Sequence, residues 1–158
     1  MATVDKTPTQ PDIHGVVQGN GGTTDNLAGG AGNDRLEGHA ANNSYYGGAG
    51  NDTFIISGKF AESSGAHEGA SRAFGDQFAF VTDFGGAGGW SASNNDFIAL
   101  IGWGAGSTLT LNGPAGDGAN GAKVYYYTIT DGVTGNVFNM EINSLNGKEL
   151  GKGDYAFY

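Results

Sequence analysis

The chain has 158 residues, and its 16 acidic and 7 basic residues give a formal net charge of −9 at pH 7. A chain this acidic does not bind DNA or RNA by neutralising phosphates, and anionic lipid repels it, so we expect neither a nucleic-acid partner nor a membrane partner. The absence of Cys excludes disulfides and thiolate metal ligands. The 31 Gly make up about a fifth of the chain, where roughly 7% is usual.

Residues 1–18 are polar and contain Pro8 and Pro11. This composition is typical of an extended linker. A linker at the start of the chain favours a piece of a longer, multidomain protein. We expect the rest, residues 19–158, to form a single module.

Residues 20–55 contain an internal repeat of nine residues, which reads NGGTTDNLA, GGAGNDRLE, GHAANNSYY and GGAGNDTFI. The sixth position always carries a carboxylate or an amide (Asp25, Asp34, Asn43 and Asp52), and the eighth is always large and apolar (Leu27, Leu36, Tyr45 and Phe54). The plain alternative is a Gly- and Asn-rich surface loop. Two GGAGND copies and four apolar positions in phase argue against it.

The spacing of the repeat predicts a coiled backbone. Six residues of Gly, Asn and Asp favour a turn, because Gly adopts positive φ without steric cost. The three residues that follow form a short strand whose middle side chain points inward. Two units complete one coil, so each turn stacks on the turn two units away. Asp34 then faces Asp52, and Asp25 faces Asn43 on the other side.

Stacked acidic turns repel each other unless a cation lies between them. Carboxylates and tightly turned backbone carbonyls form an all-oxygen cage, which suits a hard ion such as Ca²⁺. Zinc is disfavoured, because the repeats contain no Cys and only one His, His39. Bound Ca²⁺ would also cancel part of the net charge.

The remainder of the chain is rich in aromatic and β-branched residues and predicts strands over 74–84, 95–103, 123–130 and 136–145. Residues 131–135 predict a hairpin turn between the last two, and the terminal DYAFY predicts a final strand. We see no convincing helix. The fold class we expect is all-β, with a parallel β-roll over 19–56 and a β-sandwich-like cap over 57–158.

The two GGAGND copies resemble the RTX family, whose nonapeptides bind calcium in a parallel β-roll. The segments after the repeats are similar to those of the R-modules of secreted mannuronan C-5 epimerases, which act on alginate: Asp52–Phe54, Phe80–Phe84, Asn95–Leu100, Gly102–Gly104, Tyr125–Tyr127 and Val137–Ile142. The last residues, Asp154–Tyr158, resemble a C-terminal export signal. The resemblance implies a bacterial protein that is secreted by type I export and works outside the cell.

The family's ligand pattern implies two calcium sites. The stronger site would use Gly30, Gly32 and Asp34 with Gly47, Ala49 and Asp52. The other would use Gly21, Thr23 and Asp25 with Gly38, Ala40 and Asn43, and would be weaker or empty because Asn43 carries no charge. Asp76, Asp83 and Asp96 are open to two interpretations: a ligand near the end of the roll, or caps of loops and strands.

The sequence contains no catalytic centre that we recognise. His67-Glu68 lacks the second His of a zinc protease motif. The G-x-G-x-x-G letters of Gly116–Gly121 precede a predicted strand instead of a helix, which argues against a dinucleotide site.

We therefore expect a non-catalytic, monomeric R-module from an isomerase, a mannuronan C-5 epimerase. It would fold on extracellular calcium and support the catalytic module of its parent chain. The alternative is the C-terminal folding and secretion domain of another exported enzyme, a metalloprotease or a lipase. An adhesin module or a small enzyme in its own right is a third reading.

Candidate contacts with alginate are Arg35, Lys59, Arg72, Lys123 and Tyr126. Tyr126 would stack on a sugar ring, and the basic residues would meet the carboxylates of the polymer. Scattered basic residues more often serve solvation. The net charge of −9 predicts weak alginate binding by this module alone.

Overall fold

The computed structural model describes residues 2–5, 12–18, 25–38, 43–58, 79–89 and 94–158, with the backbone alone for residues 2–5, 12–18 and 25. The described part is almost entirely β-structure, as expected, and its one regular helical element is a single 3₁₀ turn, Ala119–Gly121. The strands are β1 (Ala2–Asp5), β2 (Asp12–Gln18), β3 (Asp25–Glu37), β4 (Asn43–Ala49), β5 (Thr53–Ser57), β6 (Ala79–Phe84), β7 (Phe97–Ile101), β8 (Thr108–Asp117), β9 (Lys123–Thr130), β10 (Val137–Ser144) and β11 (Tyr155–Phe157). Within this part of the chain, no helix is long and apolar enough to cross a bilayer.

The repeats form the predicted coil. The first part of β3 pairs in parallel with β4, placing Leu27 opposite Tyr45, and its last part pairs in parallel with β5, placing Leu36 opposite Phe54. Both registers join residues that are 18 apart, the length of two nonapeptides. The register therefore confirms that two units complete one coil.

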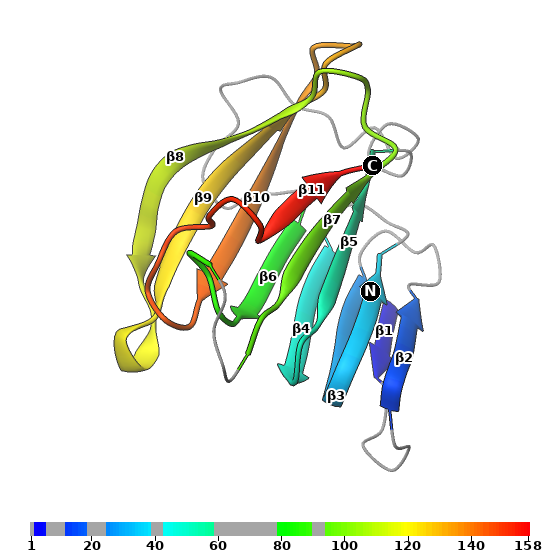
Figure 1. Cartoon of the computed structure of the whole chain (residues 1–158), viewed down its shortest axis with the longest axis vertical. Coiled ribbons are helices and arrows are strands. Elements are labelled where there is room, and N and C mark those ends of the chain that lie inside the picture. The colour runs from blue at the N-terminus through cyan, green and yellow to red at the C-terminus, as the bar shows by residue number, and fades with distance from the viewer. Residues whose placement is uncertain (1, 6–11, 19–24, 39–42, 59–78, 90–93) are drawn as a thin grey trace.

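The segments after the repeats continue the same two sheets (Figure 1). On one sheet β6 pairs in parallel with β4, and β10 pairs in parallel with β6. On the other sheet β7 pairs in parallel with β5, and β11 pairs in parallel with β7. The hairpin of β10 and β9 forms over the predicted turn, and β8 pairs antiparallel to β9 at the edge. The strands of the cap thus extend the roll instead of packing on it as a separate layer.

The core lies between the two sheets. The eighth position of each repeat points inward as predicted, with Leu27, Leu36, Tyr45 and Phe54 each 2% exposed or less. The rings of Tyr45 and Phe54 meet edge to face at 6.1 Å between centroids. Inward side chains of the later strands join this cluster, among them Val81, Ile98, Tyr127, Phe138 and Met140. One continuous core therefore connects the repeats to the rest of the molecule.

Two stretches differ from the expectation. Residues 2–5 and 12–18, within the predicted linker, form β1 and β2, which pair in parallel with β3; the module boundary at residue 18 stays a prediction. The sequence also did not indicate β8, whose Gly113 and Pro114 are unusual in strands. Edge strands tolerate Pro because one side needs no partner, and β8 has register shifts on both sides of Gly113 and Pro114.

Candidate metal centre

Two repeat turns, Gly29–Asp34 and Gly47–Asp52, lie directly above one another. Gly30 pairs with Gly48, and Ala31 pairs with Ala49. The second and fourth residues of each turn have positive φ: 136° at Gly30, 112° at Gly32, 96° at Gly48 and 132° at Gly50. L-residues rarely adopt this conformation, so the turn needs glycine at both places.

Backbone carbonyls of the two turns point into the space between them. A Cβ on Gly48 would overlap the carbonyl oxygen of Gly30, and a Cβ on Gly50 would overlap that of Gly32. In the opposite direction, a Cβ on Gly29 would overlap the carbonyl oxygen of Gly47. Three of the carbonyls that the family pattern implies as ligands therefore face the same gap.

The side chains of Asp34 and Asp52 reach the same gap. Both are buried. Asp34 Oδ2 lies 2.6 Å from the position that a Cβ on Gly29 would take, next to the carbonyl of Gly47. The backbone N–H of Asp34 donates to Asp52 Oδ1 at 2.8 Å. The structure thus brings Gly30, Gly32, Asp34, Gly47 and Asp52 together.

The second oxygen of Asp52 is not satisfied by the protein. The residue is 1% exposed, and its Oδ2 is buried without a hydrogen-bond partner. Burial, with smaller repulsion from Asp34 and Asp83, raises the pKa of Asp52 to about 6. A buried carboxylate oxygen among carbonyls is costly unless a cation meets it.

The donor set fits calcium. All the converging atoms are oxygens, the ligands that Ca²⁺ prefers. Among the described residues, no group of three or more His, Cys, Asp or Glu side chains is placed to hold a metal. Backbone carbonyls must therefore complete the shell. Individual ligand assignments, including the carbonyl of Ala49, stay predictions.

The second predicted site is only partly visible. Gly21, Thr23 and Ala40 lie outside the described residues, and Asp25 is described by its backbone alone. Asn43 is buried at the end of its turn, close to Gly38, and its Nδ2 donates to the hydroxyl of Tyr45 at 3.5 Å. The weaker site therefore stays a prediction.

Two of the three aspartates that the sequence left open lie at the turn stack; Asp76 lies outside the described residues. Asp83 accepts the N–H groups of Gly47 and Gly48 at 2.8 and 2.7 Å. Asp96 accepts the N–H groups of Asp52 and Gly85 at 2.9 and 2.7 Å. Both aspartates thus accept hydrogen bonds from the backbone, as caps would. Burial nevertheless raises the pKa of Asp83, and it raises the pKa of Asp96 to about 7.

The candidate alginate contacts do not form one patch. Arg35 is exposed on the sheet that contains β5 and β7. Lys123 is exposed and Tyr126 half-buried on β9, which belongs to the other sheet. Lys59 and Arg72 lie outside the described residues.

Comparison with known proteins supports the metal assignment. A family model described as the RTX calcium-binding nonapeptide repeat matches residues 19–54 in four copies. Curated proteins and solved structures produced no match to the chain. The matched segment contains both stacked turns and the four units found by the nine-residue period. Residues 19–54 are therefore a calcium-binding RTX repeat module, and calcium is the metal of its turns.

Proposed function

We propose that the chain is a non-catalytic module that folds on extracellular calcium. The observation that carries this proposal is Asp52 Oδ2, which is buried against Gly47 without a hydrogen-bond partner, in a turn that stacks on the carbonyls of Gly30 and Gly32. Without a cation, the burial of the Asp52 carboxylate, with a smaller contribution from repulsion by Asp34, opposes folding. Because calcium binds the folded turns and not the unfolded chain, it stabilises the fold by mass action. Extracellular calcium modules bind at roughly 10⁻⁴–10⁻³ M, which suits a switch between the cytosol and the outside.

Type I export is the second part of the proposal. RTX repeat proteins are typically exported by this route, and low cytosolic calcium would keep the module unfolded for passage. In the folded chain the predicted export signal includes β11, which pairs with β7. Asp154, just before β11, accepts the N–H groups of Gly88 and Gly151 at 2.7 and 2.6 Å. The signal would therefore act before calcium folds it into the sheet.

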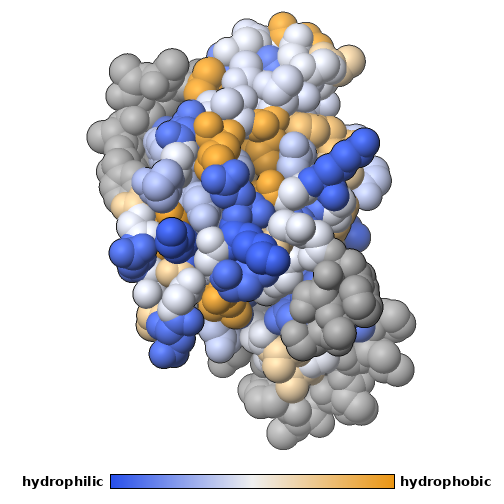
Figure 2. All heavy atoms as spheres, turned by 60° about the vertical axis from the view of Figure 1, so that its left-hand side comes forward, coloured by the Kyte–Doolittle hydropathy of each residue, from blue (hydrophilic) through white to orange (hydrophobic). Residues whose placement is uncertain are grey.

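The parent that we propose is a mannuronan C-5 epimerase, with the module as a monomeric support for the catalytic module. The resemblance of the segments after the repeats supports this parent. The alternative is the C-terminal folding and secretion domain of an exported metalloprotease or lipase. On the face shown in Figure 2, hydrophilic side chains are interspersed with apolar ones, which suits a solvated monomer.

We also propose that the module contacts alginate directly. Lys123 and Tyr126 lie on the same strand but three residues apart, so their side chains face opposite sides of the sheet and would contact the polymer separately. Arg35 would contact it from the other sheet. Titration with alginate oligomers at constant calcium tests this contact. Amide shifts at Lys123 and Tyr126 would support it, and a spectrum that does not change would remove alginate from the proposal.

Calcium titration followed by circular dichroism and amide NMR tests the folding proposal. The double variant Asp34→Ala/Asp52→Ala should lose the sharpening of the spectrum that calcium produces in the native chain. Asp117→Ala is the matched control, because Asp117 is an exposed aspartate on the edge strand β8. A native chain that is equally folded in chelator would contradict calcium-dependent folding.

A further inference from the structure

The chain contains the letters of a further repeat in two separated pieces. Residues 85–88 read GGAG, and residues 95–99 read NDFIA. Joined, they read GGAGNDFIA, which matches the pattern of GGAGNDTFI at 47–55. Residues 89–94 lie between the fourth and fifth positions of this unit. The RTX match ends at residue 54 and does not include it.

The backbone places both pieces where a repeat would lie. Ile98, at the eighth position, is fully buried and lies opposite Phe54, the eighth residue of the preceding unit on that side. Gly86 and Gly88, at the second and fourth positions, have positive φ of 77° and 85°. These are the two positions at which the intact turns also have positive φ.

A ladder of asparagines joins the three turns at the fifth position. The N–H of Asn51 donates to Asn33 Oδ1 at 2.8 Å. The N–H of Asn95 donates to Asn51 Oδ1, also at 2.8 Å. The split unit thus repeats a contact that links the two intact turns.

A second ladder joins the turns through the aspartates at the sixth position. The N–H of Asp52 donates to Asp96 Oδ1 at 2.9 Å, as the N–H of Asp34 does to Asp52 Oδ1 at 2.8 Å. Asp52 and Asp96 therefore each direct one carboxylate oxygen at the backbone of the preceding turn. Asp96 makes the same contact with Asp52 that Asp52 makes with Asp34.

Three buried carboxylates contact the second turn, and one of them, Asp96, also contacts the split unit. Asp52 Oδ2 lies against Gly47 and has no hydrogen-bond partner. Asp83 accepts the N–H of the same glycine, and Asp96 accepts the N–H of Asp52. A buried carboxylate oxygen without a hydrogen-bond partner is costly unless a cation meets it, and Asp52 Oδ2 is such an oxygen.

A backbone carbonyl oxygen lies beside the second position of the split turn, as it does in the intact turn. A Cβ on Gly48 would overlap the carbonyl oxygen of Gly30 in the preceding turn. At the equivalent Gly86, a Cβ would overlap the carbonyl oxygen of Asn94, the last residue of the insertion. The last residue of the insertion thus brings a backbone oxygen to the second position of the split turn.

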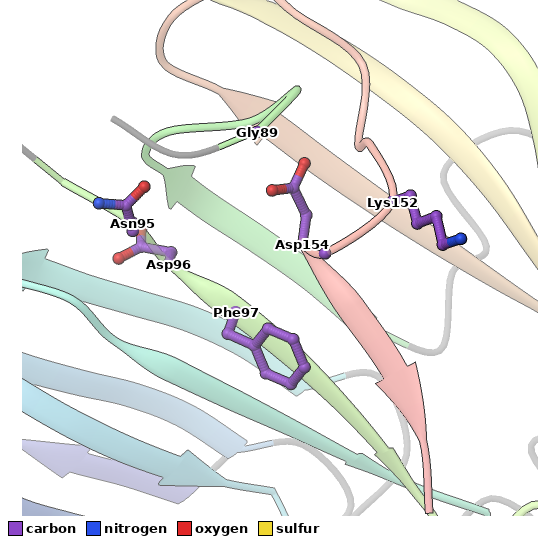
Figure 3. A pocket seen from close by; sticks show the side chains of 7 residues that line it. Gly89, Asn95, Asp96, Phe97, Lys152 and Asp154 are labelled. Atoms are coloured by element: carbon purple, nitrogen blue, oxygen red, sulfur yellow. The ribbon is translucent and has the colours of Figure 1, made fainter. Parts of the chain in front are cut away.

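A cleft of about 410 Å³ opens beside the split unit and is lined by Gly89, Asn95, Asp96, Phe97 and the segment Lys152–Asp154 (Figure 3). It offers a solvent route to the end of the turn stack.

We propose that Gly85–Gly88 and Asn95–Ala99 form a fifth turn of the roll, and that this turn and Gly47–Asp52 hold a further calcium ion between backbone carbonyls and the carboxylates of Asp52 and Asp96, the counterparts of Asp34 and Asp52. Among the described residues, no group of three or more acidic or His side chains is placed to hold a metal, so backbone carbonyls supply the rest of the shell, as in the repeats. Asp83 holds the second turn through the N–H groups of Gly47 and Gly48. This inference rests on the proposed calcium-dependent function.

Native mass spectrometry and calorimetric calcium titration of the intact chain test the proposal. Asp96→Asn should remove one bound calcium ion or weaken it by at least about tenfold. Asp34→Asn should weaken a different ion and leave this one bound. Asp117→Asn, on the exposed edge strand, serves as the control and should titrate as the unchanged chain does.

The outcomes separate the two proposals. If the unchanged chain binds no calcium, both the proposed function and this site are wrong. If Asp34→Asn weakens calcium binding and Asp96→Asn titrates as the unchanged chain does, only the fifth turn is wrong.

An independent readout is needed because Asp96 also accepts two backbone N–H bonds, and its substitution can unfold the turn. Amide NMR of the Asp34→Asn chain provides that readout. Calcium should still shift the amides of Gly85 and Asp96 in this background. Amides that do not move at saturating calcium would overturn the proposal.

Discussion

Buried aspartates lie in turns in two regions of this molecule, and folding shifts their pKa values in opposite directions. In the roll, Asp52 and Asp96 are buried and their pKa values are raised to about 6 and about 7. In the hairpin between β9 and β10, Asp131 accepts the N–H groups of Gly104, Val133 and Thr134 at 2.8–2.9 Å. These bonds lower its pKa to about 2. The hairpin directs three backbone donors at one carboxylate, whereas the roll provides one for Asp52 and two for Asp96 and leaves Asp52 Oδ2 buried without a hydrogen-bond partner. The roll thus leaves that oxygen to a metal ion.

Removal of calcium should have the largest effect, and it should act on the roll. A ligand at about 100 times its dissociation constant stabilises the folded state by about 2.7 kcal/mol per site, so the loss of each bound ion costs a comparable amount. We expect metal-free protein to unfold at a much lower temperature, with amide protection lost around Asp34 and Asp52. Calorimetry and hydrogen exchange with and without calcium measure this change. Equal melting temperatures would contradict it.

A methyl group in the turn stack should have the next largest effect. Gly48 has a φ of 96°, and a Cβ there would overlap the carbonyl oxygen of Gly30. Gly135 in the hairpin has a φ of 73° but open space around its Cβ position. Gly135→Ala should therefore cost about 1–2 kcal/mol from backbone conformation alone. Gly48→Ala should cost more and also weaken calcium binding.

Urea unfolding in saturating calcium compares the two alanine variants. Calorimetric calcium titration supplies the second readout, in which Gly135→Ala should match the unchanged chain. Equal losses of stability in the two variants would show that the carbonyls of the stack are not held as closely as the structure places them.

The nine-residue period was sufficient to predict the coil and the inward eighth position, because a strand of three residues has only one inward side chain. It was also sufficient to pair Asp34 with Asp52. It did not identify β8, since Gly113 and Pro114 are tolerated there only because β8 lies at the edge of a sheet.

The roles of Asp83 and Asp96 could not be decided from the sequence, because residues 89–94 interrupt the period that would have aligned Asp96 with Asp52. Only the pairing of β7 with β5 restores that alignment. Asp83 belongs to no repeat position, and its contact with Gly47 spans 36 residues of sequence. The nine-residue period thus predicts contacts between repeat units. The contacts of Asp83 and Asp96 depend on strand pairing between segments that are distant in the sequence.

The pH dependence of the metal-free chain should distinguish the two regions. The pKa values of Asp52 and Asp96 rise on folding from 3.8 to about 6 and about 7. Protonation therefore stabilises the folded roll, fully below pH 3.8, and this stabilisation is lost as the pH rises through 6 and 7. Asp131 stays ionised in both states across this window and contributes no slope.

The metal-free chain should therefore unfold at a higher urea concentration in mild acid than at neutral pH. Calcium should reverse this order, since protons compete with the ion for the carboxylates. Urea midpoints measured with and without calcium across this window check the sign. A metal-free chain whose stability rises towards neutral pH would show that these carboxylates are solvated.

The smallest effect should come from the hairpin. Asp131→Asn removes the charge that three backbone N–H groups stabilise, and should cost about 1–2 kcal/mol at neutral pH. Because folding lowers the pKa of Asp131 from 3.8 to about 2, its contribution is present above pH 3.8 and is lost as the pH falls through 2. An NMR titration of the Asp131 carboxyl carbon measures that pKa, and urea unfolding in saturating calcium measures the cost of the substitution. Calcium binding should not change, because Asp131 lies in the hairpin between β9 and β10 and belongs to none of the repeat turns. A weaker calcium affinity in Asp131→Asn would show that the hairpin and the turn stack are coupled through the core that joins them.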